Sequence, residues 1–478
     1  MPYKLLLSFG LYQHFGQLFS ELKPKNTKVK IKLVILLCLL LFLPSAWIVI
    51  TRMEGGKPAV LLELPSPYIG LSTEFKGNVS DPGSGVRKIW IGLLKDGKEL
   101  VLKEEEFSSQ SFISGGVVND IPIQMKIEPR KLGIDDGKAI IRIAAWDYSW
   151  RNWWQGNRIY LEYEVVIDTK PPVIDILTKT HNISQGGAGL VIYRVSETDA
   201  KTGVVVGGNF FPGYSGYFKD GAVFMAFIAL DHLQGTDTEI HAEAMDKAGN
   251  SARAGFPYYL KKKVFKKDTI SIPDQFLNWK MPEFNIADSP GSQLNGIEKF
   301  LVVNRKMRKE NEDLFAGLAG KTEKNLYWEG TFLRLPKSAT RSGFADRRSY
   351  RYKGKIVDHQ YHMGIDLAST AHSSVPAAND GKVVFADVNG IYGKTVVLDH
   401  GFGLFSLYSH LSRIIVQKGE MVARGSVIGL TGTTGLAGGD HLHYGMMVQN
   451  VFINPLEWWD SAWIQNNITS KIEEFHNG

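Results

Sequence analysis

The chain of 478 residues contains a single cysteine, Cys38. No disulfide can form within the chain, so the small secreted scaffolds that depend on disulfides are excluded. Hydrophobic residues make up 44% of the sequence and charged residues 22%, a composition that also excludes disordered and collagen-like chains. At roughly 100–200 residues per domain, the length predicts about three domains, each with its own hydrophobic core.

Long hydrophobic runs are equally scarce, since only the stretch from Leu33 to Ile50 continues for 18 residues without a charge. This length is near the lower limit of roughly 17–25 residues for a membrane-spanning helix. Lysines dominate the preceding flank, and such an excess is retained on the cytoplasmic side. We therefore expect a cytoplasmic basic segment at residues 1–32 and a transmembrane anchor at 33–51. A cleaved signal peptide is the alternative, but Leu43–Trp47 is a poor cleavage site.

The net positive charge is confined to this region. Residues 1–57 hold eight basic and two acidic side chains, which accounts for the whole net charge of +6. The basicity therefore indicates membrane orientation and gives no support to nucleic-acid binding. It predicts a single-pass protein of the cytoplasmic membrane with its N-terminus inside and the rest periplasmic or otherwise extracytoplasmic.

Downstream of the span, short alternating apolar runs are separated by Gly, Asp, Asn and Pro, a pattern typical of antiparallel strands and tight turns. Two stretches are alike, because each ends a strand at an aspartate, Asp147 or Asp246, that can cap the next turn. Pro171-Pro172 forms a stiff joint between them. The pattern predicts two β-sandwich modules, residues 58–170 and 171–262.

Both modules resemble the immunoglobulin-like repeats of bacterial surface proteins. Asp246–Asn250 carries their Asp-x-x-Gly-Asn turn and Asp168–Pro172 their Asp-Thr-x-Pro-Pro joint. The resemblance implies immunoglobulin-like sandwiches that act as spacers or offer a surface to a protein partner. A linker is expected at residues 263–329, with a charged helix from Ile297 to about Leu318.

Histidines are concentrated near the C-terminus, with seven of the 12 between residues 359 and 443. These are His359, His362, His372, His400, His410, His441 and His443. Such clustering indicates a metal or acid–base site.

Three fragments carry this signal. On a strand, His362 and Asp366 point to the same face, with Gly364 leaving room between them. Period two likewise puts His441 and His443 on one face. Two imidazoles and a carboxylate, with a fourth position for water, form the ligand set of a catalytic zinc site. The remaining histidines are then free to handle protons, and His410 stands alone on an apolar strand.

The segment from about Phe332 to Trp459 resembles the lysostaphin-type, LytM-like zinc metalloendopeptidases, which are peptidoglycan hydrolases. The resemblance rests on His362-Met363-Gly364-Ile365-Asp366, on Tyr408-x-His410-Leu411, on His441-x-His443 and on the entry segment Thr340–Arg348. It implies a zinc peptidase domain at residues 330–460, followed by a tail at 461–478.

By this resemblance one zinc ion per chain is held by His362, Asp366 and His443. His410 and His441 are the catalytic histidines, and which of them is the general base is left open. The family's usual Ser-Thr-Gly-Pro is replaced by a segment ending at Asp440, a departure that removes neither a ligand nor a catalytic histidine.

The sequence thus predicts a mainly β chain with an N-terminal transmembrane helix, two immunoglobulin-like β-sandwiches, a helical spacer and a C-terminal antiparallel β-sheet zinc peptidase domain. The expected function is that of a membrane-anchored zinc metalloendopeptidase that binds peptidoglycan peptide stems and hydrolyses their cross-links. Three alternatives stay open: a catalytically weak activator of other murein hydrolases, a zinc peptidase acting on an exported protein, and a scaffold whose sandwiches bind a partner.

Overall fold

The computed structural model describes residues 27–111, 113–286 and 294–476. It divides into two compact units, Met1–Lys170 and Pro171–Gly478. The division falls at the start of the Pro171-Pro172 pair. Most of the predicted cytoplasmic segment 1–32 lies outside the described residues.

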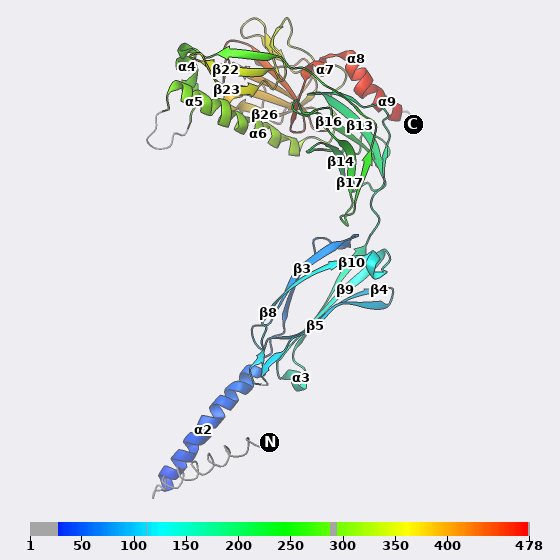
Figure 1. Ribbon diagram of the computed structural model, residues 1–478, viewed down its shortest axis with the longest axis vertical. Coiled ribbons are helices and arrows are strands. Elements are labelled where there is room, and N and C mark those ends of the chain that lie inside the picture. Colours follow the sequence, from blue (N-terminus) through cyan, green and yellow to red (C-terminus); the bar gives the residue numbers. More distant parts are fainter. Residues whose placement is uncertain (1–26, 112, 287–293, 477–478) are drawn as a thin grey trace, which may run out of the picture. The chain divides into compact units, whose positions relative to one another are not determined.

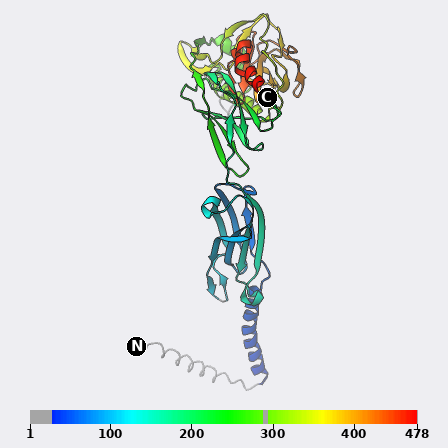
Figure 2. The same ribbon diagram turned by 90° about the vertical axis from the view of Figure 1, so that its right-hand side faces the viewer.

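Helix α2, Thr27–Arg52, precedes the strands of the first unit and is drawn in blue (Figure 2). Its part from Ile31 to Arg52 is long and apolar enough to cross a membrane. Leu40 and Phe42 expose 64% and 67% of their surface, so the helix does not bury its apolar side chains in the protein. This helix has the length and composition of a membrane anchor and equally those of a signal segment.

The strands of the first unit form two layers (Figure 1). One sheet has the order β1-β3-β8, with β1 Ala59–Glu63, β3 Thr73–Ser80 and β8 Asp120–Ile127. The other has the order β2-β10-β9-β4-β5, with β2 Tyr68–Ile69, β10 Arg158–Ile167, β9 Gly137–Asp147, β4 Val86–Lys95 and β5 Lys98–Glu106. The shorter elements are β6 Ser109–Ser111, β7 Gly115–Gly116, η1 Pro129–Leu132 and α3 Arg151–Trp154.

A single hydrophobic core lies between these layers. Alternate residues of β4 and β9, such as Ile89, Ile91, Ile141 and Ile143, are at most 2% exposed, as expected for strands with one face on a core. The core is thus separate from that of the second unit. The immunoglobulin-like assignment of the strands stays a prediction.

The second unit begins with three small sheets. The first has the order β11-β13-β16, with β11 Ile174–Ile176, β13 Ala188–Val195 and β16 Val223–Ala229. The second pairs β12 Asn182–Ser184 with β19 Tyr259–Lys261. The third has the order β15-β14-β17-β18, with β15 Asn209–Pro212, β14 Lys201–Val206, β17 Ile240–Met245 and β18 Ser251–Gly255.

Residues 263–329 contribute both a strand and helices. Strand β20 pairs in parallel with β22, which pairs with β23. These strands span Lys267–Ser271, Arg347–Tyr352 and Lys355–Tyr361. The helices are α4 Asp274–Lys280, η2 Met281–Glu283, α5 Gly296–Val302, η3 Val303–Met307, α6 Arg308–Leu318 and η4 Ala319–Lys321. The helix expected from Ile297 to Leu318 is therefore present as α5, η3 and α6, beginning at the Asn295 capping box.

An eight-stranded sheet forms the C-terminal part, in the order β21-β24-β32-β28-β27-β26-β30 with β33 beside β32. Its strands are β21 Ala339–Ser342, β24 Ile365–Ala368, β32 Leu442–Val448, β28 Leu404–Leu411, β27 Lys394–Asp399, β26 Gly381–Val388, β30 Met421–Val422 and β33 Val451–Ile453. A smaller sheet holds β25 Ser374–Pro376, β31 Val427–Leu430 and β29 Arg413–Ile414. The remaining elements are η5 Gly390–Tyr392, α7 Pro455–Trp459, α8 Ser461–Ile464, η6 Gln465–Thr469 and α9 Ser470–His476. The β28 and β32 side chains are all buried, so both faces of the sheet are covered.

One hydrophobic core runs through the second unit, from Ile183 to Ile468. The rings of Tyr214 and Phe402 stack with centroids 4.8 Å apart, which joins the small sheets to the large one. Glu457 adds a polar link, because its Oε2 accepts a hydrogen bond of 2.9 Å from the Ala188 amide. The small sheets and the eight-stranded sheet are therefore held in one packed body.

Burial raises the pKa of Glu457 to about 7, from an ordinary value of 4.5. Between these values the folded chain keeps a proton that the unfolded chain loses, so this carboxyl lowers stability as pH rises through that window. Glu457→Gln retains an acceptor for the Ala188 amide and removes the buried charge. We expect this substitution to raise the free energy of unfolding by about 3 kcal/mol more at pH 8 than at pH 4.5.

Thermal unfolding at pH 4.5 and pH 8 measures this difference. Glu473→Gln, on the exposed face of α9, is the matched control and should shift the Tm equally little at both pH values. Equal Tm changes for Glu457→Gln at the two pH values would contradict the prediction.

Candidate functional site

A group of three ionisable side chains comes from neighbouring strands of the large sheet. Strand β24 pairs with β32 so that Asp366 lies directly opposite His443. His362 precedes β24, and its ring turns back toward Asp366. The strand alternation expected to align His362 with Asp366 is therefore wrong as a cause, because β24 begins only at Ile365. The segment between β23 and β24 is irregular and bends at Gly364, and this bend lies between the two residues.

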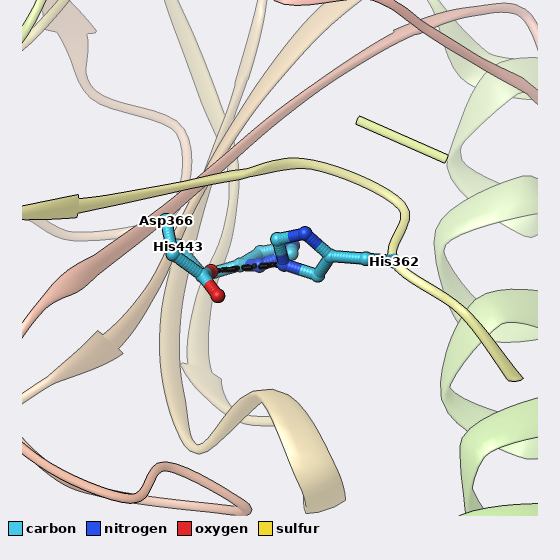
Figure 3. A group of neighbouring side chains, drawn as sticks. All are labelled: His362, Asp366 and His443. Atoms are coloured by element: carbon cyan, nitrogen blue, oxygen red, sulfur yellow. Dashed lines mark hydrogen bonds and ion pairs between the residues drawn. The ribbon is translucent and has the colours of Figure 1, made fainter. Parts of the chain in front are cut away.

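The three side chains meet at a single point (Figure 3). Nε2 of His362 lies 2.9 Å from Oδ1 of Asp366 and 2.9 Å from Nδ1 of His443, and the last two atoms are 3.0 Å apart. All three residues are buried. Ligand atoms about 2.0–2.1 Å from a tetrahedral zinc ion would be about 3.3 Å from one another. The donor set and its spacing thus fit a zinc ion with small adjustments.

Hydrogen bonds orient the donors. Nδ1 of His362 bonds the Gly343 carbonyl at 2.8 Å, which makes Nδ1 the protonated nitrogen and leaves the Nε2 lone pair free. Burial lowers the pKa of His362, and it lowers that of His443 to about 4, so both rings are neutral as metal ligands must be.

Asp366 is ionised despite its burial. Burial by itself would raise the pKa of its carboxyl, but the adjacent His362, together with hydrogen bonds from His441 and His443, outweighs this and holds the pKa well below its usual range. The guanidinium of Arg348 also donates to its Oδ2 at 2.9 Å. This bond leaves Oδ1 to face the two histidines.

His410 and His441 lie beside this group. Their ring centroids are 4.8 Å apart, and Nε2 of His441 is 3.5 Å from Oδ1 of Asp366. Nδ1 of His410 bonds the Thr434 carbonyl at 2.8 Å, and Nδ1 of His441 bonds the Gly439 carbonyl at 2.7 Å. Both rings therefore keep Nε2 as the nitrogen available for other contacts.

The environments of these two rings differ. Burial and the neighbouring histidines hold the pKa of His410 well below its usual value. Burial opposes the charged form of His441 as well, but Asp366 outweighs it and raises the pKa of His441. His410 also has a left-handed backbone, with φ of 61°, which is costly for a non-glycine residue and frequent at functional sites.

These five side chains lie around a cavity of about 390 Å³. His362, Asp366, His410, His441 and His443 all line it. The opposite wall comes from the segment before the large sheet and includes Ile270, Pro273, Phe276, Phe300 and Arg308. A mainly apolar cleft with a few convergent polar groups is typical of a binding site.

Two basic residues that support the site carried no distinct sequence signal. Arg348 stands in a run of basic residues that suits an exposed face equally well, yet it reaches Asp366 from β22. Lys280 is fully buried and donates to Glu283 and to the Thr433 carbonyl, next to the residue that binds His410. Only the folded chain reveals the contacts of Arg348 with Asp366 and of Lys280 with the Thr433 carbonyl, because these partners are 18 and 153 positions apart.

The other clustered histidines lie elsewhere. His400 is fully buried, with Nδ1 2.6 Å from the Asp380 carbonyl and Nε2 2.7 Å from Ser406 Oγ. His359 and His372 are exposed. Asp440, which departs from the resembled pattern, accepts a hydrogen bond of 2.6 Å from Thr431 Oγ1 and so ties the loop after β31 to the segment before β32.

The C-terminal part of the chain is similar to known proteins. Residues 360–455 match the model described as Peptidase family M23. Peptidoglycan DD-endopeptidase ShyB of Vibrio cholerae is 36% identical over 109 residues, which cover 23% of this chain and 25% of ShyB. DD-carboxypeptidase/endopeptidase Mpg of Neisseria gonorrhoeae is 36% identical over 107 residues, covering 22% and 25%. The chain therefore matches about a quarter of the length of these curated relatives.

Among solved structures, the catalytic domain of lysostaphin from Staphylococcus simulans is 26% identical, with a TM-score of 0.24. That match covers 27% of this chain and 98% of the lysostaphin domain.

Gly364 provides a direct test of the site's packing. A β-carbon there would lie 2.6 Å from Cε1 and Nε2 of His443 and 2.8 Å from the Tyr444 carbonyl. Gly364→Ala should displace the His443 ring and lower the zinc content of the purified protein to less than half of the wild-type value, measured by mass spectrometry.

Gly438→Ala is the matched control, since a β-carbon at that cavity residue meets nothing within 4 Å. Its zinc content should equal that of wild type. A folded Gly364→Ala variant with full zinc content would show that the close approach to His443 is unimportant.

Proposed function

Because residues 360–455 belong to peptidase family M23, we propose that this protein is a zinc metalloendopeptidase that hydrolyses the peptide cross-links of peptidoglycan. The observation that carries the proposal is the buried convergence of His362, Asp366 and His443, all three among the matched residues, at the cleft. The name of ShyB, a peptidoglycan DD-endopeptidase, supports this substrate class, and the name of Mpg, a DD-carboxypeptidase/endopeptidase, supports the type of reaction.

His362 Nε2, Asp366 Oδ1 and His443 Nδ1 are the atoms that would hold the metal. A zinc ion bound there supplies a Lewis acid that polarises the scissile carbonyl and lowers the pKa of water. Arg348 fixes the Asp366 carboxylate, and the Gly343 carbonyl fixes the His362 ring. Such outer hydrogen bonds keep the ligand atoms directed at one point.

His410 and His441 are proposed to move protons in this reaction. One Nε2 takes the proton of the attacking water and passes it to the leaving amine. The other Nε2, when protonated, donates a hydrogen bond to the oxyanion as it forms. Their Nδ1 bonds to the Thr434 and Gly439 carbonyls keep both Nε2 atoms available for these tasks.

The cleft also suits an acidic peptide. Arg308 and Arg348 line it, and peptidoglycan stem peptides carry carboxylates that such guanidinium groups attract. Helix α2 is proposed to anchor the chain in the cytoplasmic membrane, with the catalytic domain outside the cytoplasm, where this substrate lies. The first unit then serves as a spacer or offers a surface to a protein partner.

Substitution of the histidines separates metal binding from proton transfer. His443→Ala should abolish zinc binding and hydrolysis together. His441→Ala should keep stoichiometric zinc and lower turnover at least about 100-fold, because it removes a proton-transfer or oxyanion contact and no ligand. Zinc content and the rate of muropeptide release measure the two effects, and full activity in His441→Ala would refute its assigned role.

The substrate is tested by incubating the full chain, solubilised in detergent, with purified peptidoglycan sacculi. We expect cross-linked muropeptides to be converted into monomers, the conversion to stop with a strong chelator and to return with added zinc. A protein that holds zinc and cleaves peptides but not sacculi would instead favour an exported protein as substrate. A protein that releases products only with a second hydrolase would favour an activator.

A further inference from the structure

A second cluster of acidic side chains lies in the first unit, apart from the residues discussed so far. It consists of Glu54, Asp81 and Asp147, whose nearest oxygen atoms all lie within 4.8 Å of one another. Glu54 belongs to the segment after helix α2, Asp81 follows β3, and Asp147 ends β9. Three segments distant in sequence therefore bring carboxylates to one place, which we call the junction cluster.

The junction cluster leaves buried oxygen atoms without partners. Asp81 is 3% exposed; its Oδ1 accepts from the Gly83 and Ser84 amides at 2.9 and 3.1 Å, while its Oδ2 has no hydrogen-bond partner in the described chain. Oε1 of Glu54 and the hydroxyl of Ser84, which is 2% exposed, are likewise buried and unpartnered there. Because unpaired buried acceptors are costly, native proteins satisfy almost all of them. Unpartnered carboxylate oxygens in such a group indicate a missing positive partner.

The surrounding backbone is shaped to hold these carboxylates. A β-carbon at Gly83 would overlap the carboxylate of Glu54. The chain near Glu54 is also tied to the turn after β9, since Ser149 Oγ donates to its carbonyl at 3.1 Å and Asn157 Nδ2 to that of Gly56 at 2.8 Å. These hydrogen bonds thus hold the backbone at Glu54 and Gly56 against the loop after β9.

No side-chain cation neutralises the junction cluster. Arg52 is nearby and 5% exposed, and its guanidinium donates to the Tyr148 carbonyl while its Nε is buried without a hydrogen-bond partner in the described chain; no ion pair within 4.0 Å joins it to the three carboxylates there. Burial, followed by the charge of Asp81, raises the pKa of Asp147 despite its bonds to Asn157 and Ser149. Three acids in contact with one another without a counter-charge are unfavourable.

The second module shows the contrast. Its corresponding aspartate, Asp246, accepts from the Asn250 amide and side chain at 2.8 and 2.7 Å, so both of its oxygens have local partners, as those of Asp147 do. In the described residues, no companion carboxylates form such a group with it. The carboxylates added by Glu54 and Asp81 are therefore a feature of the first module.

We propose that the junction cluster binds a calcium ion, which ties the segment after helix α2 to the first β module. Calcium prefers oxygen ligands, tolerates irregular geometry and accepts several carboxylates, whereas zinc favours histidine and cysteine. The ion neutralises the three acids and gives the unpartnered oxygens of Asp81 and Glu54 a ligand. It joins three chain segments without a disulfide, which a chain with one cysteine cannot form.

Calcium-dependent unfolding of the full chain in detergent tests the proposal. At about 100-fold excess over its Kd, calcium should raise the Tm of the first unit by roughly 10 °C relative to a calcium chelator. Asp81→Asn and Glu54→Gln should each abolish this rise. Asp135→Asn and Glu164→Gln, at exposed carboxylates of the same unit, should retain it.

Binding is measured directly with terbium, whose luminescence is sensitised by nearby tryptophans such as Trp150. We expect a signal that calcium displaces and that both junction variants lack, while zinc content and wall hydrolysis in calcium-free buffer are unchanged. A variant that fails to fold leaves the other variant and the wild-type titration to decide.

Absence of terbium and calcium binding in the wild-type protein would overturn the proposal. Binding that survives in the folded junction variants would overturn it too, and an equal Tm rise with magnesium would refute the assignment to calcium. None of these outcomes affects the proposed peptidase, because its metal site lies in the other unit and is tested by zinc content.

Discussion

The pairing of β24 with β32 is the constraint on which the candidate site depends. Its register places Asp366 opposite His443, and these two residues come from segments almost eighty positions apart. A shift by one residue would turn one of them to the other face of the sheet. The buried side chains of β32 and β28 hold this register. The packing of the hydrophobic core therefore also fixes the positions of the metal-donor atoms.

Backbone carbonyls then specify what each imidazole can do. Gly343, Thr434 and Gly439 each accept from the Nδ1 of one histidine, which leaves the corresponding Nε2 free. Thr434 follows Thr433, whose carbonyl is bound by the buried Lys280. The segment before the sheet is therefore connected to the orientation of His410, and it forms one wall of the cleft as well.

Each of the two candidate metal sites includes a carboxylate, but the other donors differ. At His362 and His443, neutral imidazoles share one carboxylate that Arg348 also binds, a donor set suited to zinc. At the junction cluster, carboxylates alone converge and no cation from the described residues neutralises them, a donor set suited to a hard cation. In a chain with a single cysteine, which forms no internal disulfide, metal ions would supply cross-links between distant segments.

Much of this was accessible from the sequence. The apolar run from Leu33 to Ile50, the alternating strands and the helix before Leu318 are local patterns, because each depends on neighbouring residues. The clustered histidines also indicated a metal site and named its residue types. Strand alternation is the wrong reason for the approach of His362 to Asp366, since β24 begins only at Ile365 and the chain bends at Gly364.

What the sequence determined by itself is the chemistry available: which donors exist, which stretches are apolar and where the positive charge lies. Tertiary structure alone decided which of these groups meet. Arg348 could not be distinguished from its basic neighbours, nor Asp81 from any other acid in a turn, because their partners are brought close only when distant strands pack. Burial also lowers the pKa of His443, and burial is a property of the folded chain.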